Sequence, residues 1–512
     1  ERQLPKLNVA SSILAARSKL TLDPSRNPGC RRRLTPRGAA ADCAMADGST
    51  LPFSPSRAVR PPAPEPLERL PGPFALLRRL RRNPLECFTR RHFNDLIVAG
   101  GLPFKRVVLV SHPQGVRRVL LDNAGAYRKD FLQRRVLSGG LADGLLGVDG
   151  PRWKAQRRVA APIFALRQVH GFAPAMRAAA LDVVRRWPVG DDARIALDVE
   201  MRRITLEVLE RTIFTDGFGS DAETIREAMA VYFEGLGRLG PLDLLGAPKA
   251  FPRPGRRKIA AALRLFEAGI DRLIADRRAL LLWRPRTAPA DMLTALLSAD
   301  GISEAEIRSN LITLFSAGHE TTANTLTWTL ALLALAPDWR ARVEREADAA
   351  PDDALVLPVA RAVIEEALRL YPPIAALSRE ALAADELAGV KIAKGTLVVI
   401  APYVIHRHRQ LWERPQVFDP ARFLGEARAA ADRFSYLPFG AGPRTCLGGE
   451  FALQEATLAL TAIVRRYRLD LAPGESLWPR LNVTLRPQGG VRMILQSRTR
   501  IAPPATVRAA AG

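Results

Sequence analysis

The sequence predicts a mainly α protein with a long central helix and a few small β-sheets. Amphipathic patterns with apolar residues three or four positions apart recur along most of the chain, whereas short β-rich runs are few. A chain of 512 residues with 47% hydrophobic and 25% charged residues can bury a large core, which excludes disordered and collagen-like proteins. No apolar run approaches the ~20 residues that a membrane-spanning helix needs, so we expect no transmembrane anchor.

Cysteine usage and charge indicate the compartment and the partners. The four cysteines are far apart and form no CxxC pair, which favours a reducing compartment, and we expect a cytoplasmic protein. The net charge of +24 is typical of proteins that bind polyanions. However, only nine of the 76 basic residues are lysine, a bias that GC-rich codons produce, and no nucleic-acid-reading motif is present. We therefore expect no nucleic-acid partner.

The chain divides into a tail, one domain and a second short tail. Residues 1–66 combine scattered charge with a Pro-rich stretch and are expected to form a disordered basic extension. Residues 67–500 show continuous periodic patterns and are expected to form a single domain, followed by a tail at 501–512. We also hypothesise that Met45 is the native start.

The expected elements follow from periodicity and from helix-end signals. Helices are expected at 156–187, 222–233, 256–283 and 358–370, and strands at 107–110, 396–400 and 491–495. The longest helix is expected to begin at Ser303, where Glu306 completes a capping box, and to end at Pro337. Its roughly 33 residues would span about 50 Å at ~1.5 Å per residue, enough to cross the domain.

A glycine-rich loop from Phe439 to Gly449 delivers Cys446 to the start of a helix. Free backbone N–H groups and the positive end of the helix dipole favour a thiolate there, which can be a metal ligand or a nucleophile. The glycines let the backbone approach a flat group, and Arg444 can meet a carboxylate on it. One thiolate, close backbone and a basic clamp are typical of a haem site. The alternative is a buried structural cysteine after an ordinary glycine turn.

The middle of the long helix carries the segment Ala317-Gly318-His319-Glu320-Thr321-Thr322. Gly318, Thr321 and Thr325 share one face, so we expect a glycine and two hydroxyls to meet the same partner. Alternatively, the threonines bond back to the preceding turn of their own helix. A zinc hydrolase of the HExxH type is excluded, because position 323 is alanine.

Two further charge patterns are common on solvated helix faces when taken singly. Glu366 and Arg369 stand at i and i+3 before a Pro-Pro helix end, and Arg422 can complete a Glu-Arg-Arg cluster with them. Trp153 and Arg157 stand four apart on one helical face, and together they can reach an anionic group.

In this order and spacing, the motifs resemble those of the cytochrome P450 family, over residues 71–495. The resemblance implies the cytochrome P450 fold, in which the long central helix lies over haem b (iron protoporphyrin IX) and Cys446 is the proximal ligand of the haem iron. The residues that it places around the thiolate and the propionates are Phe439, Gly440, Gly448, Trp153, Arg157, Arg379 and Arg444. It also implies that Glu366, Arg369 and Arg422 lock the proximal scaffold.

The implied activity is that of a monooxygenase, an oxidoreductase that inserts one oxygen atom of O2 into a C–H bond or double bond of a hydrophobic small molecule. Glu320 and Thr321 would handle protons on the distal side. The expected pocket walls are the loop 132–146 and residues Phe315, Gly318, Ile374, Ala375, Leu377 and Asn482. The alternatives are a haem sensor of a diatomic gas, which would need a signalling module, and a peroxide-driven hydroxylase, which would not need Glu320 and Thr321.

Electrons are expected to come from another protein. Only 66 residues follow Cys446, and the Gly-x-Gly-x-x-Gly match at 235–240 lacks the preceding strand of a nicotinamide site. We expect a ferredoxin or flavodoxin-like donor with its NAD(P)H reductase. The basic residues expected to form its docking face are Arg152, Lys154, Arg158, Arg407, Arg409 and Arg414.

Overall fold

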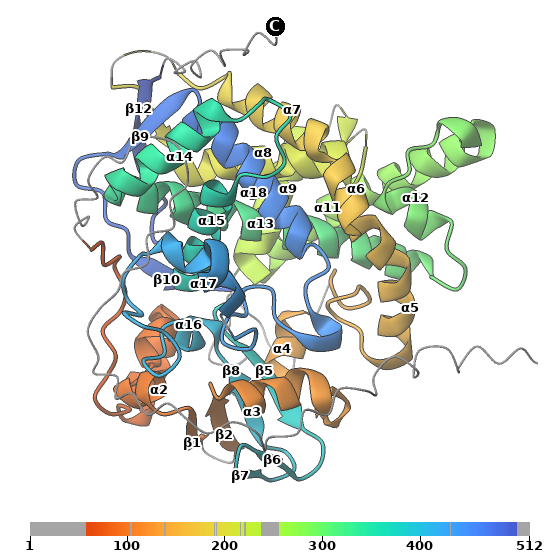
Figure 1. Cartoon of the computed structure of the whole chain (residues 1–512). Coiled ribbons are helices and arrows are strands. Elements are labelled where there is room, and N and C mark those ends of the chain that lie inside the picture. The colour runs from red at the N-terminus through yellow and green to blue at the C-terminus, as the bar shows by residue number, and fades with distance from the viewer. Residues whose placement is uncertain are drawn as a thin grey trace, which may run out of the picture. The chain divides into compact units, whose positions relative to one another are not determined.

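The expected mainly helical class is confirmed by the structure, a computed structural model (Figure 1). It describes residues 58–498 apart from residues 103–104, 138–139, 189, 191, 216, 220–221, 237–254 and 431. The predicted tail at 501–512 and most of the predicted extension, including Met45, therefore lie outside the described residues.

Residues 58–66, which the prediction counted with the extension, lie against the helical domain. The Phe418 N–H donates a hydrogen bond of 2.9 Å to the Val59 carbonyl. The Tyr371 hydroxyl donates one of 2.6 Å to the Pro62 carbonyl. These bonds join the segment to two distant parts of the chain, so the packed domain begins before residue 67.

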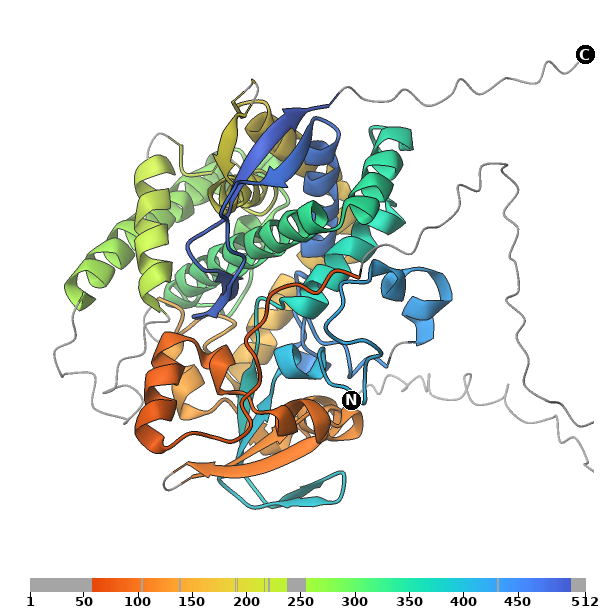
Figure 2. The same cartoon turned by 90° about the vertical axis from the view of Figure 1, so that its left-hand side faces the viewer.

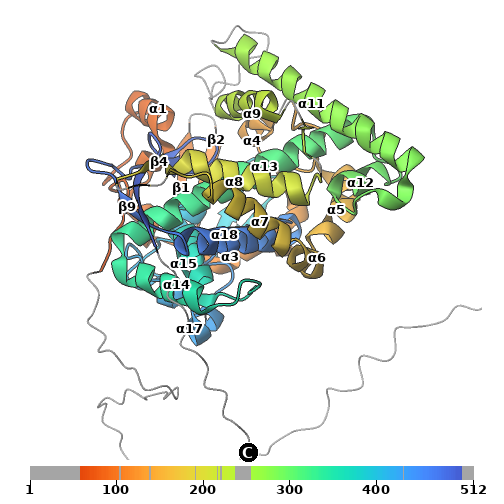
Figure 3. The ribbon, with the colours of Figure 1, turned by 90° about the horizontal axis from the view of Figure 1, so that it is seen from above.

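The long helix α13 (Glu304–Leu335) crosses the middle of the helical layer, as Figure 3 shows from above. Its start is the one predicted: the Ser303 hydroxyl accepts from the Glu306 N–H at 3.3 Å, and the Glu306 carboxylate accepts from the Ser303 N–H at 3.0 Å. Helix α14 (Pro337–Ala349) follows at once, because Pro337 cannot continue α13. From Thr322 to Leu333 every residue of α13 is buried.

Helices packed around α13 include α8 (Leu197–Thr212), α11 (Arg256–Trp283), α15 (Pro358–Leu370) and α18 (Gly449–Val464). The others are α1 (Pro73–Arg82), α2 (Arg90–Asn94), α3 (Pro113–Arg117), α4 (Phe131–Val136), α5 (Gly150–Ala160), α6 (Leu166–Gly171), α7 (Ala173–Val184), α9 (Ala222–Leu236), α12 (Met292–Leu297), α16 (Pro402–Ile405) and α17 (Gly425–Ala430). Within the described residues, none of the helices is both long enough and apolar enough to cross a bilayer.

One expected helix is wrong in extent. We predicted a single helix over 156–187. The structure instead has three helices there, α5, α6 and α7, with a 3-10 turn at Ala161–Phe164 between the first two. Pro162 and Pro174 lack the backbone N–H that a continuous helix needs, and each stands in the first turn of a new element.

A five-stranded sheet lies beside the helical layer and is seen below it in Figures 1 and 2. Its order is β1-β2-β8-β5-β3, and only the pairing of β2 with β8 is parallel. The bounds are β1 Ile97–Leu102, β2 Lys105–Val110, β3 Tyr127–Arg128, β5 Leu377–Ala381 and β8 Leu397–Ile400. Strand β5 thereby brings Arg379 and the preceding segment 373–376 from the sheet toward the helices.

Three smaller sheets complete the fold. They are β4 (Arg194–Ala196) with β12 (Arg492–Ser497) and β9 (Tyr467–Leu471), the hairpin β6 (Asp385–Leu387) with β7 (Val390–Ile392), and the hairpin β10 (Pro479–Leu481) with β11 (Leu485–Pro487). The last hairpin lies against α13, and residue Asn482 is in its turn.

Candidate functional site

The loop before α18 holds Cys446 through backbone contacts. The Cys446 N–H donates to the Phe439 carbonyl at 2.9 Å, which closes the loop on itself. Gly440 and Gly442 have φ of +69° and +72°, values that glycine adopts without strain. A Cβ on Gly442 would lie 1.8 Å from the Leu120 carbonyl oxygen, so this position admits no side chain. The glycines therefore shape the path of the loop past the sheet side of the molecule.

Cys446 is accessible to solvent, although many protein atoms lie around its thiol group. Burial raises the pKa of its thiol above the ordinary value, while a hydrogen bond from the Gly448 N–H and the charge of Arg157 act in the opposite direction. The helix start thus stabilises negative charge on the sulfur, as expected, and the protein atoms around the thiol act against it. A bound metal ion would deprotonate such a sulfur outright.

Cationic side chains from several parts of the chain gather at this loop. Arg444 forms an ion pair with Asp149, and its guanidinium lies 4.4 Å from the centre of the Trp153 ring. The guanidinium of Arg157 lies 5.6 Å from the same ring, and its NH1 donates to the Thr445 carbonyl at 3.0 Å. The predicted pair on α5 thus contacts the cysteine loop directly.

Arg379 and Lys129 add two more positive charges to this group. Arg379 NH1 donates to the Gln133 side chain at 3.1 Å, and its pKa is lowered by burial and by the charge of Arg444. Lys129, which the sequence analysis did not single out, is buried and lies 3.5 Å from Asp149. Burial, followed by the charge of Arg444, lowers its pKa to about 8. Arg444, Lys129 and Arg379 thus lie around Asp149, and Arg157 lies nearer to Cys446. Burial disfavours the charge on each of these four cations.

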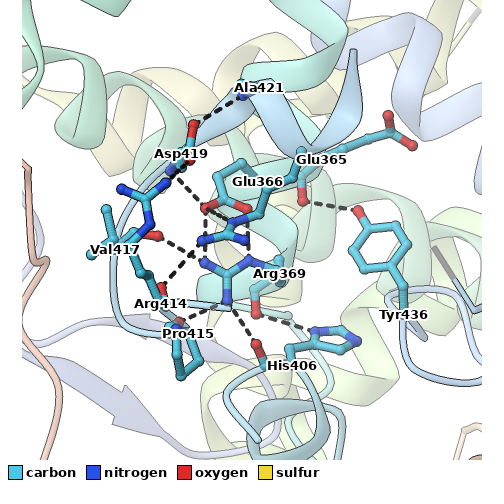
Figure 4. A network of polar contacts seen from close by, with 11 residues as sticks. Glu365, Glu366, Arg369, His406, Arg414, Pro415, Val417, Asp419, Ala421 and Tyr436 are labelled. Atoms are coloured by element: carbon cyan, nitrogen blue, oxygen red, sulfur yellow. Dashed lines mark hydrogen bonds and ion pairs between the residues drawn. The ribbon is translucent and has the colours of Figure 1, made fainter. Parts of the chain in front are cut away.

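The predicted cluster of Glu366, Arg369 and Arg422 assembles between α15 and the loops that follow it. Figure 4 shows Glu366 and Arg369 with the loop residues that contact them. Glu366 and Arg369 are fully buried, and the guanidinium donates to both carboxylate oxygens at 2.6 and 2.8 Å. Arg422 reaches Glu366 only at 3.8 Å, as an ion pair without a hydrogen bond. The Asp419 N–H donates to Glu366 at 2.8 Å. Arg369 also donates to the carbonyls of His406, Pro415 and Val417.

His406 connects this cluster to the cysteine loop, and the sequence analysis missed it. Its Nδ1 lies 3.1 Å from the Arg369 carbonyl, and its Nε2 accepts from the Leu437 N–H at 2.8 Å. Because Nε2 accepts, Nδ1 carries the proton. Burial, and then the charge of Arg369, lowers the pKa of His406 to about 3, so the ring is neutral. Its position 37 residues after Arg369 gives no local signal of this contact.

In the middle of α13, the threonine hydroxyls bond back to their own helix. Thr321 Oγ1 donates to the Ala317 carbonyl at 2.5 Å and Thr325 Oγ1 to the Thr321 carbonyl at 2.8 Å. This is the alternative that the sequence left open. Thr321 is partly exposed, and Ala317 is exposed in the middle of a helix that is otherwise largely buried. The Thr321 hydroxyl oxygen keeps lone pairs that can accept from a water or a bound molecule.

Comparison with known proteins identifies the family. The family model "Cytochrome P450" matches residues 62–494. The chain belongs to the cytochrome P450 family. It is 33% identical over 435 residues to cyclooctatin synthase of Streptomyces melanosporofaciens, covering 82% of this chain and 92% of that one. It is 30% identical to pentalenene oxygenase of Streptomyces avermitilis, covering 76% and 87%.

A solved structure shows the same fold. The crystal structure of the cytochrome P450DA heme domain superposes with a TM-score of 0.72 at 24% identity, covering 87% of this chain and all of that one. This P450 is accordingly a haem-thiolate monooxygenase, and its family uses haem as cofactor. The residues present fit that group: one accessible cysteine sulfur lies near an excess of cations, of which Lys129 is buried and three arginines are partly buried, and two propionates would supply negative charge for them.

Two predicted wall residues of this P450, Phe315 and Ala375, are buried, and a third, Gly318, packs closely against α8. Phe315 is fully buried, stacked on Phe214 with ring centres 4.0 Å apart. A Cβ on Gly318 would lie 2.9 Å from a methyl group of Leu209, so Gly318 serves the close approach of α8. Ala375 is also buried. For Phe315 and Gly318 the cause is that helix periodicity locates a face, but only packing shows which helix covers it.

The other predicted wall positions are accessible. Ile374 is 40% exposed, Leu377 is partly exposed and Asn482 is exposed, and from the loop 132–146, Leu146 is 40% exposed. Ala376, which lies within the predicted wall segment 374–377, is exposed as well. The alternation of exposed Ile374, buried Ala375 and exposed Ala376 is the period of an extended chain leading into β5.

The predicted basic docking face of this P450 is only partly present. Arg407 is buried with its guanidinium 4.2 Å from the Tyr403 ring centre, so it is no surface charge. Arg152 pairs with Glu306 and Asp143, and Arg414 with Asp419. Lys154, Arg158 and Arg409 are exposed. The cause of the error is that sequence distinguishes neither a buried arginine nor a neutralised one from a free surface charge.

Proposed function

We propose that this chain binds haem b through Cys446 and inserts one oxygen atom of O2 into a C–H bond or double bond of a hydrophobic small molecule. The observation that carries the proposal is the accessible Cys446 sulfur, presented by a glycine loop beside four cations. Bound haem supplies the iron that, with a thiolate ligand, activates dioxygen. The protein's task is to hold the group, exclude side reactions and move protons.

The binding roles follow from the contacts of each residue. Arg157, Arg379, Arg444 and Trp153 are proposed to meet the propionates, and we add Lys129 to this group. Phe439, Gly440 and Gly448 surround the thiolate, and the Gly448 N–H stabilises negative charge on the sulfur. The cluster of Glu366, Arg369 and Arg422 holds the loop that carries Cys446, with His406 as the direct link.

Thr321 and Glu320 are proposed to handle protons on the distal side. The Thr321 proton is directed to the Ala317 carbonyl, so its oxygen can accept a hydrogen bond from a water and hold it there. Glu320, the next residue, is partly exposed and can exchange protons with bulk water. A carboxylate and an accepting hydroxyl at adjacent positions can pass protons inward through that water.

The substrate is proposed to be a terpenoid hydrocarbon or its alcohol. Two relatives are named for the oxidation of pentalenene and of cyclooctat-9-en-7-ol, and each covers more than three quarters of this chain. The accessible wall positions Leu146, Ala317, Ile374 and Ala376 are apolar, which suits such a molecule better than a charged one. A binding screen that follows the low-spin to high-spin shift of the haem band tests this class, with charged compounds of equal size as controls.

Electrons are proposed to arrive from a ferredoxin or flavodoxin-like donor that is reduced by an NAD(P)H reductase. Lys154 and Arg158 on α5 offer exposed positive charge near the cysteine loop, since Arg157 of the same helix contacts Thr445. A positive surface accelerates association with an acidic donor and loses this effect as salt screens it. The reduction rate of Lys154→Glu/Arg158→Glu against ionic strength tests the face, and Arg345→Glu, an exposed arginine of α14 outside the expected face, serves as the control.

The assignment of the ligand is tested by Cys446→Ser. We expect the variant to lose the red-shifted band of the ferrous carbon monoxide complex, because only thiolate ligation produces it. Cys87→Ser is the control, since Cys87 is the other described cysteine. A wild-type spectrum in Cys446→Ser would refute the proposal.

A further inference from the structure

The turn of the β10–β11 hairpin makes a directed hydrogen-bond chain with the middle of α13. Asn324 Nδ2 donates to Thr484 Oγ1 at 3.1 Å, and Thr484 Oγ1 donates to Glu320 Oε1 at 2.7 Å. Arg486 NH1 lies 3.9 Å from the same carboxylate oxygen. Glu320 and Asn324 are one helical turn apart and therefore present one face of α13 to the hairpin.

The direction of this chain is determined by the chemistry of its members. An amide NH2 can only donate, so the Thr484 oxygen accepts from Asn324. The single hydroxyl proton of Thr484 is then left for the Glu320 carboxylate. Thr484 and Asn324 are both buried, so water does not compete for the bond between them, whereas Glu320 at the end of the chain is partly exposed. A hydrogen bond to an ionised group is stronger than one between neutral groups, and it orients the carboxylate.

The hairpin itself is anchored at other points. Asn83 donates through Nδ2 to the Pro479 carbonyl at 2.9 Å and accepts from the Leu481 N–H at 3.1 Å. The Leu485 N–H donates to the Pro373 carbonyl at 2.9 Å, next to the accessible Ile374. Asn482, in the turn itself, is exposed and precedes Thr484 by two residues. A molecule that contacts Asn482 therefore contacts the same turn whose Thr484 binds Glu320.

We propose that Thr484 is a positioning residue for Glu320, and that the hairpin which contacts the substrate also orients the carboxylate that supplies protons. This inference rests on the proposed proton role of Glu320. The consequence is that substrate contact and proton supply share one structural element. Loss of the Thr484 hydroxyl releases Glu320 without removing it, so reducing equivalents are diverted to hydrogen peroxide.

The test compares Thr484→Val, which keeps the shape and removes the hydroxyl, with Thr484→Ser, which keeps the hydroxyl. Thr327→Val is the matched control, because Thr327 is a buried threonine of α13 whose hydroxyl donates to the Ala323 carbonyl and not to Glu320. In the haem-loaded protein, the share of consumed electrons that appears as hydrogen peroxide is measured together with the dissociation constant of the substrate from the spin shift.

We expect Thr484→Val to raise the peroxide share several-fold and to leave the dissociation constant of the substrate unchanged. Thr484→Ser should show the peroxide share of the wild type. A displaced hairpin would instead weaken substrate binding, because Asn482 would move with it. The second readout does not depend on activity. It compares the melting temperatures of Thr484→Val, Glu320→Ala and the double variant with that of the wild type. We expect the double variant to lose less than the sum of the single losses, since either change already breaks the bond.

The outcomes separate this inference from the proposed function. If Glu320→Ala changes the peroxide share but Thr484→Val behaves like Thr327→Val, the positioning role is refuted and the proton role of Glu320 stands. If Glu320→Ala itself leaves the peroxide share at the wild-type value, both are refuted. Additive melting temperatures, or a Thr484→Ser variant that matches Thr484→Val, would also overturn the inference.

Discussion

Two carboxylates of this P450, Glu366 and Glu320, have opposite surroundings. Glu366 is fully buried and accepts two hydrogen bonds from Arg369 and one from the Asp419 N–H. Glu320 is partly exposed and accepts one hydrogen bond, from Thr484. A carboxylate enclosed by several donors holds its neighbours in place, whereas one with a single hydrogen-bond donor keeps contact with water. The first region maintains the fold and the second is suited to turnover.

The largest expected effect is on the enclosed carboxylate. Arg369→Ala leaves Glu366 buried without its main partner, which costs about 3–5 kcal/mol of the free energy of unfolding. We expect loss of haem content together with loss of folded protein, measured by absorbance and by chemical denaturation.

Arg422→Ala provides the comparison within the same cluster. Arg422 reaches Glu366 only at 3.8 Å, so its loss is expected to cost clearly less than the loss of Arg369. Equal losses for the two variants would contradict the view that the bidentate contact dominates.

The next effect concerns the cysteine loop. Gly442→Ala places a methyl group on the Leu120 carbonyl, a backbone atom that cannot rotate away, in addition to the cost of positive φ. Gly440 has nearly the same φ with open space around it, so Gly440→Ala isolates the conformational term of about 1–2 kcal/mol. Denaturation curves and haem content of the pair should show the larger loss for Gly442→Ala. Identical denaturation curves for the two variants would contradict the close contact between Gly442 and the Leu120 carbonyl.

A third effect depends on pH and again belongs to the enclosed region. The pKa of His406 is about 3 in the folded protein and 6.5 by default, so the unfolded chain binds this proton first as pH falls. The stabilisation from the neutral ring is therefore complete above pH 6.5 and is lost toward pH 3. Between pH 6.5 and 5 the loss is about 2 kcal/mol.

His406→Gln should remove this part of the pH dependence while lowering stability at pH 7.5. His170→Gln, at an exposed position, should leave the pH dependence as in the wild type. Melting temperatures at pH 7.5 and 5 measure both. If the melting temperature of His406→Gln fell between pH 7.5 and 5 as much as that of the wild type, the ring of His406 would not be held neutral in the folded protein.

The smallest effect on stability is expected in the open region. Thr321→Ala removes a hydroxyl that bonds back to its own helix, and alanine favours a helix more than threonine does, so the melting temperature should stay the same or rise slightly. The same change should raise several-fold the share of consumed electrons that appears as hydrogen peroxide, because the water that the hydroxyl holds is lost. Thr325→Ala is the control, since its buried hydroxyl makes the same kind of bond one turn further. Unchanged coupling in Thr321→Ala would remove Thr321 from the mechanism.

The sequence by itself determined the helices whose ends are encoded locally, and it determined the chemistry of the motifs. Ser303 with Glu306 begins α13, Pro337 ends it, and α15 spans the predicted 358–370, because caps and prolines act on their own turn. The pairing of Glu366 with Arg369 and the delivery of Cys446 by a glycine loop also follow from residues a few positions apart.

Only the tertiary structure decided which of these residues are enclosed and which are open. His406 joins Arg369 to Leu437 across 37 and 31 residues, Thr484 meets Glu320 across 164, and Lys129 enters the cation group from a separate segment. Arg407 and Phe315 were expected at surfaces and lie in the core. The physical reason is that burial depends on which distant element covers a side chain, and no local pattern in a single chain carries that information.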